Sequence, residues 1–407
     1  MNREIKVLML CDFACTTGFA QVAHNIVEQL FKEKELSYKI DIIAINYFGD
    51  PNKWQKYYPQ IRLFPAMVND KNKDPFGRQK YLDFYMTGDY DLTFILQDTF
   101  NLIDLCHVRQ TGNINLSKDK KKVPKLILYF PIDSSPKKRW VNDVIATADQ
   151  SIVYTKYGYE EVLKVNEKMT HLLISPHGTN IDHFNVINES ETKQFRQEYY
   201  PNASQNKFLI TNVNRNQHRK DLPSTLKGYK LYRDRYNTNS FLYLHCMNKD
   251  VGHDLHDIAQ QLGLRKDIDY MIPEKMTDLK TINLIYNSSD CVVTTTHGEG
   301  WGLSITEAMA TKTPVIAHNV TSVPEIFDGS KRGWPVNSNG TVFNILDNNR
   351  ERPQIDIEHF AQVIDEVRLK ADENDFNTRI NNAYEYVKEN TWDKLGKFWR
   401  DTFKSQL

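Results

Sequence analysis

The sequence predicts an α/β protein built from two doubly wound, Rossmann-like domains. Its 407 residues exceed what one ordinary hydrophobic core organises, and they suit two domains of roughly 180 to 200 residues each. Short apolar runs alternate with longer helical stretches along the chain. This alternation is typical of parallel sheets covered by helices on both faces.

Eleven short apolar runs are the expected strands, and a helical stretch such as 21–31 separates most of them because parallel neighbours need a crossover. In the first half the expected strands are Lys6–Leu10, Ile40–Ile45, Leu92–Leu96, Leu126–Phe130, Ser151–Tyr154 and His171–Ile174. In the second half they are Phe208–Val213, Phe241–Cys246, Tyr270–Ile272, Cys291–Thr295 and Val315–Ala317. A polar, asparagine-rich segment, 180–206, separates the halves, and we expect domains at 1–182 and 183–387.

The segment His297–Glu325 carries the most specific functional signal. A strand feeds a turn with three glycines, and the turn opens a helix whose free N–H groups and positive dipole end attract anions. Glu299 and Glu307 stand on this turn and helix with seven residues between them. Carboxylates accept hydrogen bonds from hydroxyl groups, so the pattern predicts a ligand with two sugars flanking a diphosphate. Alternatively, the carboxylates are solvated and Trp301 belongs to the core.

The pattern E-G-W-G-L-S-x-x-E-A-M-A, followed by T-P-V-I-A and P-E, resembles the signature of the retaining family-four glycosyltransferases. The resemblance implies the GT-B architecture, with two Rossmann-like domains facing across a cleft and a final helix that returns to the first domain. Residues 388–407 have the periodic apolar positions for that helix. It also implies that Glu299 contacts the transferred sugar and Glu307 the ribose. Backbone amides expected at the diphosphate are those of Gly300, Trp301, Gly302 and Leu303.

A second segment matches the same family. The loop after Phe208–Val213 contains Arg215 and Lys220, which resemble the family's Arg-x4-Lys pair. The resemblance implies that both cations bind the donor diphosphate and offset the charge that grows on the leaving nucleotide. Together with Glu299 they are expected catalytic residues. His218 and Arg219 are expected to be the solvated remainder of this loop, although either can reach a diphosphate.

The acceptor side is expected in the first domain. Relatives have a glycine-rich loop after the first strand, and this chain keeps only Gly18, preceded by Thr17. Gly18 is an expected donor contact and Thr17 an acceptor-side candidate, while Asp12 and Thr16 are alternatives as helix caps. Many relatives also have a histidine after the strand Leu126–Phe130, where the nearest polar residue here is Asp133.

Asp133 is therefore the expected acceptor-side catalytic carboxylate, which would orient the acceptor hydroxyl, accept its proton or support the oxocarbenium charge. Asp98, after the preceding strand, is the second candidate. Both are equally compatible with structural roles at a helix start.

Composition limits the function classes. Charges balance at 52 basic and 52 acidic residues, so net charge does not call for a nucleic acid partner. No apolar run approaches a membrane span, and we expect a cytoplasmic protein. His253 and His256 lack a third spaced ligand, so no metal site is expected, and transfer in relatives needs no metal or cofactor. Basic stretches at Lys118–Lys122 and Lys137–Arg139 are candidates for a polyanion or membrane surface, or simply solvated faces.

We therefore expect a retaining glycosyltransferase with a UDP-, GDP- or ADP-sugar donor and a hydroxyl acceptor on a glycan, a lipid carrier or another polymer. One alternative is glycosylation of a modified nucleic-acid base. Others are a non-catalytic nucleotide-sugar binder and a nucleotide-sugar epimerase.

One departure from the family tests the fold directly. Relatives usually have glycine where the helix after the motif ends in a left-handed turn, and this chain has Lys312. Either the turn is kept and Lys312 adopts a positive φ at a cost of about 1 kcal/mol, or the helix ends differently.

Overall fold

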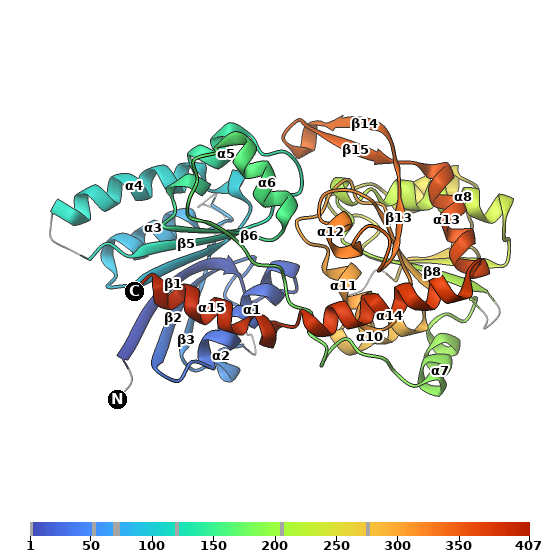
Figure 1. The fold of residues 1–407 in the computed structure, drawn as a ribbon, viewed down its shortest axis with the longest axis horizontal. Coiled ribbons are helices and arrows are strands. Elements are labelled where there is room, and N and C mark those ends of the chain that lie inside the picture. The colour runs from blue at the N-terminus through green and yellow to red at the C-terminus, as the bar shows by residue number, and fades with distance from the viewer. Residues whose placement is uncertain (1–2, 51–53, 68–73, 119–121, 204–206, 274–276) are drawn as a thin grey trace. The chain divides into compact units, whose positions relative to one another are not determined.

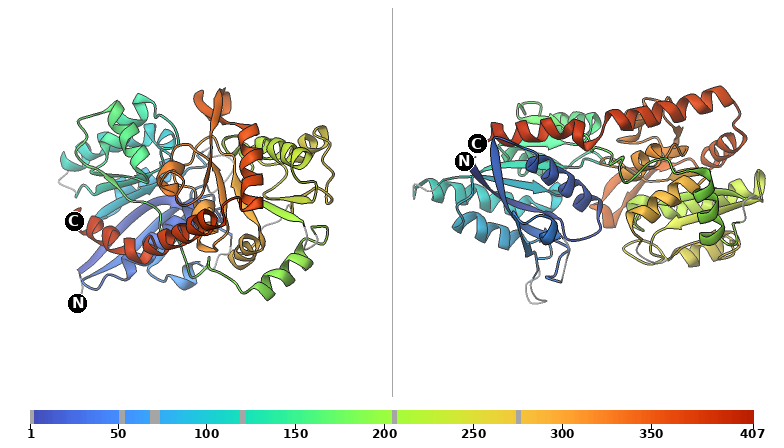
Figure 2. Two further views of the ribbon diagram at one scale, coloured as in Figure 1. Left: turned by 45° about the vertical axis from the view of Figure 1, so that its right-hand side comes forward. Right: turned by 90° about the horizontal axis from the view of Figure 1, so that it is seen from below.

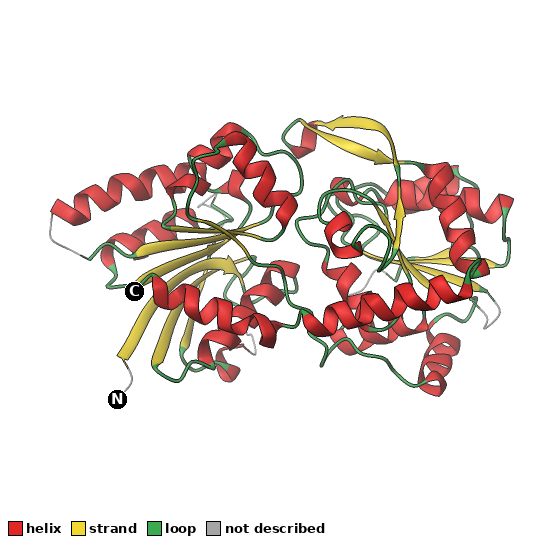
Figure 3. Ribbon diagram, in the orientation of Figure 1, coloured by secondary structure: helices red, strands yellow, loops and turns green. Residues whose placement is uncertain are grey.

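The computed structural model describes residues 3–50, 54–67, 74–118, 122–203, 207–273 and 277–407. The chain divides into two compact units. Unit 1 contains Met1–His177 together with Trp392–Leu407, and unit 2 contains Gly178–Thr391. In each unit, helices cover both faces of a central sheet, as Figure 3 shows by colour.

Unit 1 is built on a parallel sheet whose strand order is β3-β2-β1-β4-β5-β6-β7. The strands are β1 Arg3–Asp12, β2 Leu36–Ile45, β3 Ile61–Pro65, β4 Leu92–Leu96, β5 Lys125–Phe130, β6 Gln150–Val153 and β7 Leu172–Ile174. The helices are α1 Gly18–Phe31, α2 Trp54–Tyr57, α3 Arg78–Thr87, α4 Ile103–Lys118, α5 Lys138–Asn142, α6 Lys156–Val165 and α15 Trp392–Ser405, with 3-10 turns η1 Thr99–Asn101 and η2 Ile145–Thr147.

The C-terminal helix α15 completes the core of unit 1. It lies alongside α1 (Figures 1 and 2), and Gln29 of α1 donates a hydrogen bond to Asp393 over 2.7 Å. The buried rings of Trp399 and Phe403 pack against Phe94 of β4 at centroid distances of 6.2 and 5.6 Å. Burial of these aromatic rings ties the end of the chain to the sheet of the first unit.

Unit 2 is built on a parallel sheet with the order β10-β9-β8-β11-β12-β13. The strands are β8 Phe208–Val213, β9 Ser240–His245, β10 Tyr270–Met271, β11 Cys291–Thr294, β12 Val315–His318 and β13 Trp334–Val336. The helices are α7 Glu189–Tyr199, α8 Leu222–Arg235, α9 Leu255–Gln261, α10 Leu279–Ser288, α11 Leu303–Ala310, α12 Val323–Phe327, α13 Ile357–Leu369 and α14 Glu373–Glu389. A 3-10 turn, η3 His218–Lys220, precedes α8.

An antiparallel hairpin interrupts unit 2 between β13 and α13. Its strands are β14 Ser338–Asn344 and β15 Arg350–Ile355, joined through the 3-10 turn η4 Ile345–Asp347. The side chain of Arg352 is buried and contacts Asp347 with its Nε 2.5 Å from Oδ2. This ion pair fixes the tip of the hairpin to its own strand.

Strand order determines where each sheet has its crevice. The order reverses between β1 and β4 in unit 1 and between β8 and β11 in unit 2. In doubly wound sheets, ligands bind at the carboxyl ends of the strands beside such a reversal. The loops after β8 and β11 are therefore the place to examine in unit 2.

The expected fold is confirmed in its main points. Each of the eleven expected strands is present, with ends shifted by a few residues. The expectation omitted β3, β13 and the hairpin, whose sequences carry prolines, charges or polar residues in place of an apolar run. Lys312 has a φ of 59°, so of the two possible outcomes the left-handed turn after α11 is kept.

Candidate functional site

Two loops meet at the strand-order reversal of unit 2, one after β8 and one after β11. The amide of His297 donates to the carbonyl of Arg219 over 2.8 Å, which joins the loops through the backbone. Thr295 adds a side-chain bond of 2.8 Å to the carbonyl of Asp221. These contacts hold the basic loop against the glycine-rich turn.

Glu299 is the centre of the resulting cluster. Its carboxylate is buried, and it accepts from Lys220 Nζ at 2.5 Å and from Arg219 Nη1 at 3.0 Å. Burial raises the pKa of Glu299, but the two neighbouring cations outweigh it and lower the pKa to about 2. Glu299 is therefore ionised at neutral pH.

The backbone of Glu299 is fixed as firmly as its side chain. Its amide donates to Thr321 Oγ1 over 2.8 Å, and the same hydroxyl donates to the Glu299 carbonyl over 3.0 Å. Arg219 also donates to the carbonyl of the preceding glycine, Gly298. The carboxylate is thus held in one orientation before any ligand arrives.

The expectation that Arg219 is a solvated remainder of the loop is wrong. Its guanidinium makes two contacts with the glycine-rich turn, and its side chain is mostly covered. Arg219 and Lys220 are successive residues of the short 3-10 turn η3, and both side chains reach the carboxylate of Glu299. A dibasic pair before a helix start was the available sequence signal.

Arg215, the other expected diphosphate ligand, has a different partner. Its Nε and Nη2 lie 2.5 and 3.0 Å from the two carboxylate oxygens of Asp250, and its side chain is 56% exposed. The hydrogen bonds from Arg215 lower the pKa of Asp250. Glu299 is therefore contacted by Lys220 and Arg219, whereas Arg215 contacts Asp250.

The start of α11 follows the glycine-rich turn. Gly302 precedes the helix with a φ of 107°, a left-handed conformation that strains any side-chain-bearing residue. No side chain caps the start of α11, so the backbone amides of its first turn, beginning at Leu303, remain available to an anion. Gly300 and Trp301 are buried, and the Trp301 carbonyl accepts from Ser322 Oγ over 2.6 Å.

Glu307 lies inside α11 in an apolar environment. Burial raises its pKa to about 7, against the opposing effect of Tyr286, whose hydroxyl donates to Glu307 Oε2 over 2.8 Å. The two glutamates of the motif thus differ in charge state at neutral pH. Their geometry provides one fixed anion beside two cations and one carboxyl group that ionises near neutrality.

The candidates of unit 1 lie at the carboxyl edge of its sheet. Gly18 is the first residue of α1, and Thr17 caps that helix by accepting from the Ala20 amide over 3.1 Å. Thr17 also donates to Asp12 Oδ2 over 2.5 Å. The capping role expected for Asp12 or Thr16 therefore belongs to Thr17.

Asp98 and Asp133 follow the adjacent strands β4 and β5, and both are half-buried. Asp98 directly precedes η1, and its side chain makes no capping hydrogen bond to this turn. The parallel pairing of β4 with β5 brings the ends of the two strands to one edge.

The basic stretches of unit 1 have local partners. Lys122 contacts Asp91, Arg139 lies 3.2 Å from Asp143, and Lys137 lies over the ring of Trp140. Residues 119–121 of the first stretch are outside the described residues. Among the described residues, no helix has the length and apolar character needed to cross a bilayer. In the same part of the chain, no group of three His, Cys, Asp or Glu side chains is arranged to hold a metal ion.

Comparisons with known proteins concern both sequence and fold. Residues 193–345 match the family model Glycosyl transferases group 1. The chain is 24% identical over 197 residues to the D-inositol 3-phosphate glycosyltransferase of Corynebacterium jeikeium, covering 47% of this chain and 46% of the relative. It is 26% identical over 143 residues to the O-antigen chain mannosyltransferase RfbU of Salmonella typhimurium, covering 35% and 36%. The matches thus span less than half the length of either relative.

Solved structures resemble the whole chain. Sucrose-phosphate synthase of Thermosynechococcus elongatus has a TM-score of 0.73 at 15% identity, over 99% of this chain and 100% of that one. HepE of Anabaena, in complex with UDP and glucose, has a TM-score of 0.69 at 15% identity, over 98% and 100%. At these identities the likeness concerns the fold. Residues 193–345 therefore match glycosyl transferases group 1, and the chain as a whole has the GT-B fold.

Proposed function

We propose that the protein is a retaining glycosyltransferase that moves a sugar from a nucleotide-diphosphate-sugar donor to an acceptor hydroxyl. The observation that carries the proposal is the Glu299 cluster, in which a buried, ionised carboxylate is fixed between two cations at the start of α11. A diphosphate needs fixed positive charge, and a sugar needs a hydrogen-bond acceptor beside it. The cluster offers both where the two loops meet.

Each residue has a distinct task in this proposal. Lys220 and Arg215 bind the diphosphate, and Arg219 shares this task because it already reaches Glu299. The first-turn amides of α11 complete the anion site. Glu299 accepts hydrogen bonds from the transferred sugar, and Glu307 holds the ribose. Cations fixed before the reaction stabilise the leaving nucleotide without reorganising.

In unit 1, we propose Asp133 as the acceptor-side catalytic carboxylate and Asp98 as its neighbour, with Thr17 and Gly18 beside them at the reversal of strand order. A half-buried carboxylate at this edge is suited to orient an acceptor hydroxyl. UDP-, GDP- and ADP-sugars are the candidate donors. HepE, which shares this fold, binds UDP and glucose in its complex, and this favours a UDP-sugar as the first donor to test. We propose a cytoplasmic enzyme that uses no metal or cofactor.

The proposal is tested by release of nucleoside diphosphate from UDP-, GDP- and ADP-sugars. We expect one donor to be consumed, with transfer to an added acceptor or slow hydrolysis without it, and with the anomeric configuration retained in the product. Lys220→Ala should lower the rate about 100-fold because a fixed cation at the leaving group is lost. Lys230→Ala, which removes a surface pair on α8, is the matched control and should not change it.

Three results would contradict the proposal. Binding of donors without any turnover would indicate a nucleotide-sugar binder, and conversion to a different nucleotide sugar without acceptor would indicate an epimerase. Turnover that depends on a nucleic acid acceptor and weakens steeply with salt would favour glycosylation of a modified base.

A further inference from the structure

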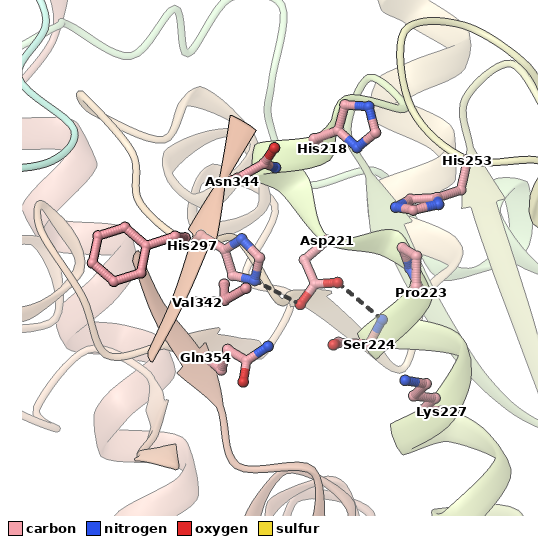
Figure 4. A pocket seen from close by; sticks show the side chains of 11 residues that line it. His218, Asp221, Pro223, Ser224, Lys227, His253, His297, Val342, Asn344 and Gln354 are labelled. Atoms are coloured by element: carbon pink, nitrogen blue, oxygen red, sulfur yellow. Dashed lines mark hydrogen bonds and ion pairs between the residues drawn. The ribbon is translucent and has the colours of Figure 1, made fainter. Parts of the chain in front are cut away.

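A cavity of about 330 Å³ lies in unit 2 beside the loops that carry the Glu299 cluster. Neither Glu299 nor the cations that hold it line this cavity. Its polar wall comes from η3, the start of α8 and the β14–β15 hairpin, as Figure 4 shows. The polar side chains that line it include His218, Asp221, Lys227, His253, Asn344 and Gln354.

The hairpin wall lies at the end of the segment that matches the family model: Val342 and Asn344 are inside the match, and Gln354 is beyond it. The match to the family model ends at residue 345, inside the tip of the hairpin. The buried Arg352 and its partner Asp347 fix this tip, and Asn344 accepts from the Leu346 amide over 2.9 Å. The wall is thus an ordered feature of this chain and not a loose extension.

The opposite side of the cavity holds a fixed carboxylate. Asp221 accepts from the Ser224 amide over 3.3 Å, and its other oxygen lies 3.0 Å from Nε2 of the buried His297 (Figure 4). Burial raises the pKa of Asp221, and the contacts with His297 and Ser224 together more than offset this, so its net shift is downward. An acceptor of hydrogen bonds is therefore held in place beside the cavity.

Hydrogen-bond donors line the same cavity. Among the described residues, no hydrogen bond or ion pair reaches the side chains of Lys227 and Gln354. The rings of His218 and His253 meet edge to face at 5.1 Å between centroids. Burial and the neighbouring His253 lower the pKa of His218, which favours a neutral ring that both donates and accepts.

This mixture of groups discriminates between ligands. A simple anion would be attracted by Lys227 but would lie beside the Asp221 carboxylate. A polyhydroxylated ring satisfies both, because each hydroxyl donates to a carboxylate or amide oxygen and accepts from an ammonium or amide group. The volume is at the lower end of the range for small-ligand sites.

We infer that this cavity binds a neutral saccharide ring through its hydroxyl groups. The cavity shares the loops after β8 and β11 with the proposed donor site, but Glu299, Arg219 and Lys220 do not line it, and saccharide binding here does not require transfer. The saccharide is either a free sugar or one unit of a glycan chain, and both sources share this chemistry.

The test uses saturation-transfer NMR on the full chain at millimolar ligand concentration. The ligands are methyl glucosides, mannosides and galactosides, and the corresponding trisaccharide of each sugar. We expect saturation transfer to at least one glycoside. Gln354→Ala and Lys227→Ala should each weaken its binding about fivefold, which corresponds to one hydrogen bond. Tighter binding of the trisaccharide would assign the site to a glycan chain, and equal binding to a free sugar.

Leu346→Ala is the matched control, because Leu346 is 70% exposed on the same hairpin and does not line the cavity. It should bind as the unaltered protein does. The inference is overturned if no glycoside binds, if binding is the same in both cavity variants, or if inorganic phosphate displaces the glycoside. Nucleoside diphosphate release is measured on the same samples, so that failure here is distinguished from failure of the proposed function.

Discussion

At the residue scale, the two glutamates of one motif lie in opposite environments. Glu299 is buried between two cations, which lower its pKa to about 2. Glu307 is buried without a cation, and burial raises its pKa to about 7. A carboxylate that lacks solvent needs a charged partner to remain ionised, and only one of the two has such a partner. Stability should therefore depend on pH in opposite directions at the two positions.

For Glu307 the folded pKa lies above the ordinary value of 4.5. The folded state then binds the proton more tightly than the unfolded state, so this group destabilises the fold progressively as pH rises from about 4.5 to 7. Glu307→Gln removes the titration and should gain stability over the unaltered protein across this window, by up to about 3 kcal/mol at pH 8. Urea unfolding at several pH values measures the difference. A constant difference between pH 4.5 and 8 would contradict the assignment.

For Glu299 the sign is reversed. Its folded pKa lies below 4.5, so it stabilises the fold above pH 4.5, and this contribution is lost as pH falls toward 2. Glu299→Gln leaves two partly covered cations without their anion and should cost about 3 kcal/mol at pH 7. The same urea series should show that cost shrinking below pH 4.5. An equal cost at pH 7 and pH 3 would show that Glu299 acts through packing alone.

Asp250 competes with the proposed donor for Arg215. The guanidinium is paired with both carboxylate oxygens, so a diphosphate must exchange with Asp250 or share the cation with it. Asp250→Asn removes the competing charge and should lower the donor dissociation constant about fivefold, a value typical of one exposed ion pair. Calorimetric titration measures it. Weaker donor binding in this variant would mean that Asp250 instead orients Arg215 for the ligand.

The sequence predicted the location of this cluster better than its partners. Spacing and glycines identified Glu299, Glu307 and the basic loop, because strand-turn-helix patterns are local. Which cation reaches Glu299 depends on how two distant loops pack together. Lys220 and Arg219 lie 79 and 80 residues before Glu299 in the chain. Arg219 was missed for this reason, since its place beside Lys220 before a helix start indicates a basic loop but does not show which residue is paired.

At the element scale, the turn after α11 keeps its shape despite an unfavourable residue. Lys312 has a φ of 59°, and its ammonium lies 4.7 Å from the ring centre of Tyr384 on α14. The cation–π contact partly compensates the backbone strain. The family resemblance predicted the turn, but it gave no indication of this contact with a helix about 70 residues later.

Two variants separate the strain from the contact. Lys312→Ala loses the ring contact and keeps a side chain in the left-handed region, whereas Lys312→Gly loses the contact and relieves the strain. The glycine variant should be more stable than the alanine variant by about 1 kcal/mol in thermal unfolding. If alanine is equal or better, the positive φ is not maintained in solution.

The β14–β15 hairpin shows why one element could not be predicted. Its strands read SNGTVFN and RERPQI, without alternation of apolar and polar residues. Its stability comes from the Arg352–Asp347 pair and from packing beside η3, and neither leaves a periodic signal. The same polar composition supplies the amides of the proposed saccharide cavity.

At the scale of the whole molecule, the fold follows from two parallel sheets whose strand order reverses once each. Apolar runs predicted the central strands, because strands buried on both faces are apolar throughout. Edge strands such as β3 and β13 were missed, since partial exposure permits prolines and charges. The expected domains, 1–182 with 388–407 packing back on it and 183–387, remain a prediction.

The most direct test of the central claim, that a sugar nucleotide binds to the loops after β8 and β11, is calorimetric titration of the preferred donor into Arg215→Ala. Arg215 is 56% exposed, so its removal should leave the fold intact. Arg235→Ala, which breaks an exposed pair with Glu358 elsewhere in unit 2, is the control. We predict about tenfold or greater weakening for Arg215→Ala, as expected for a lost charge-assisted bond, and no change for the control. Unchanged donor binding in Arg215→Ala would contradict the account.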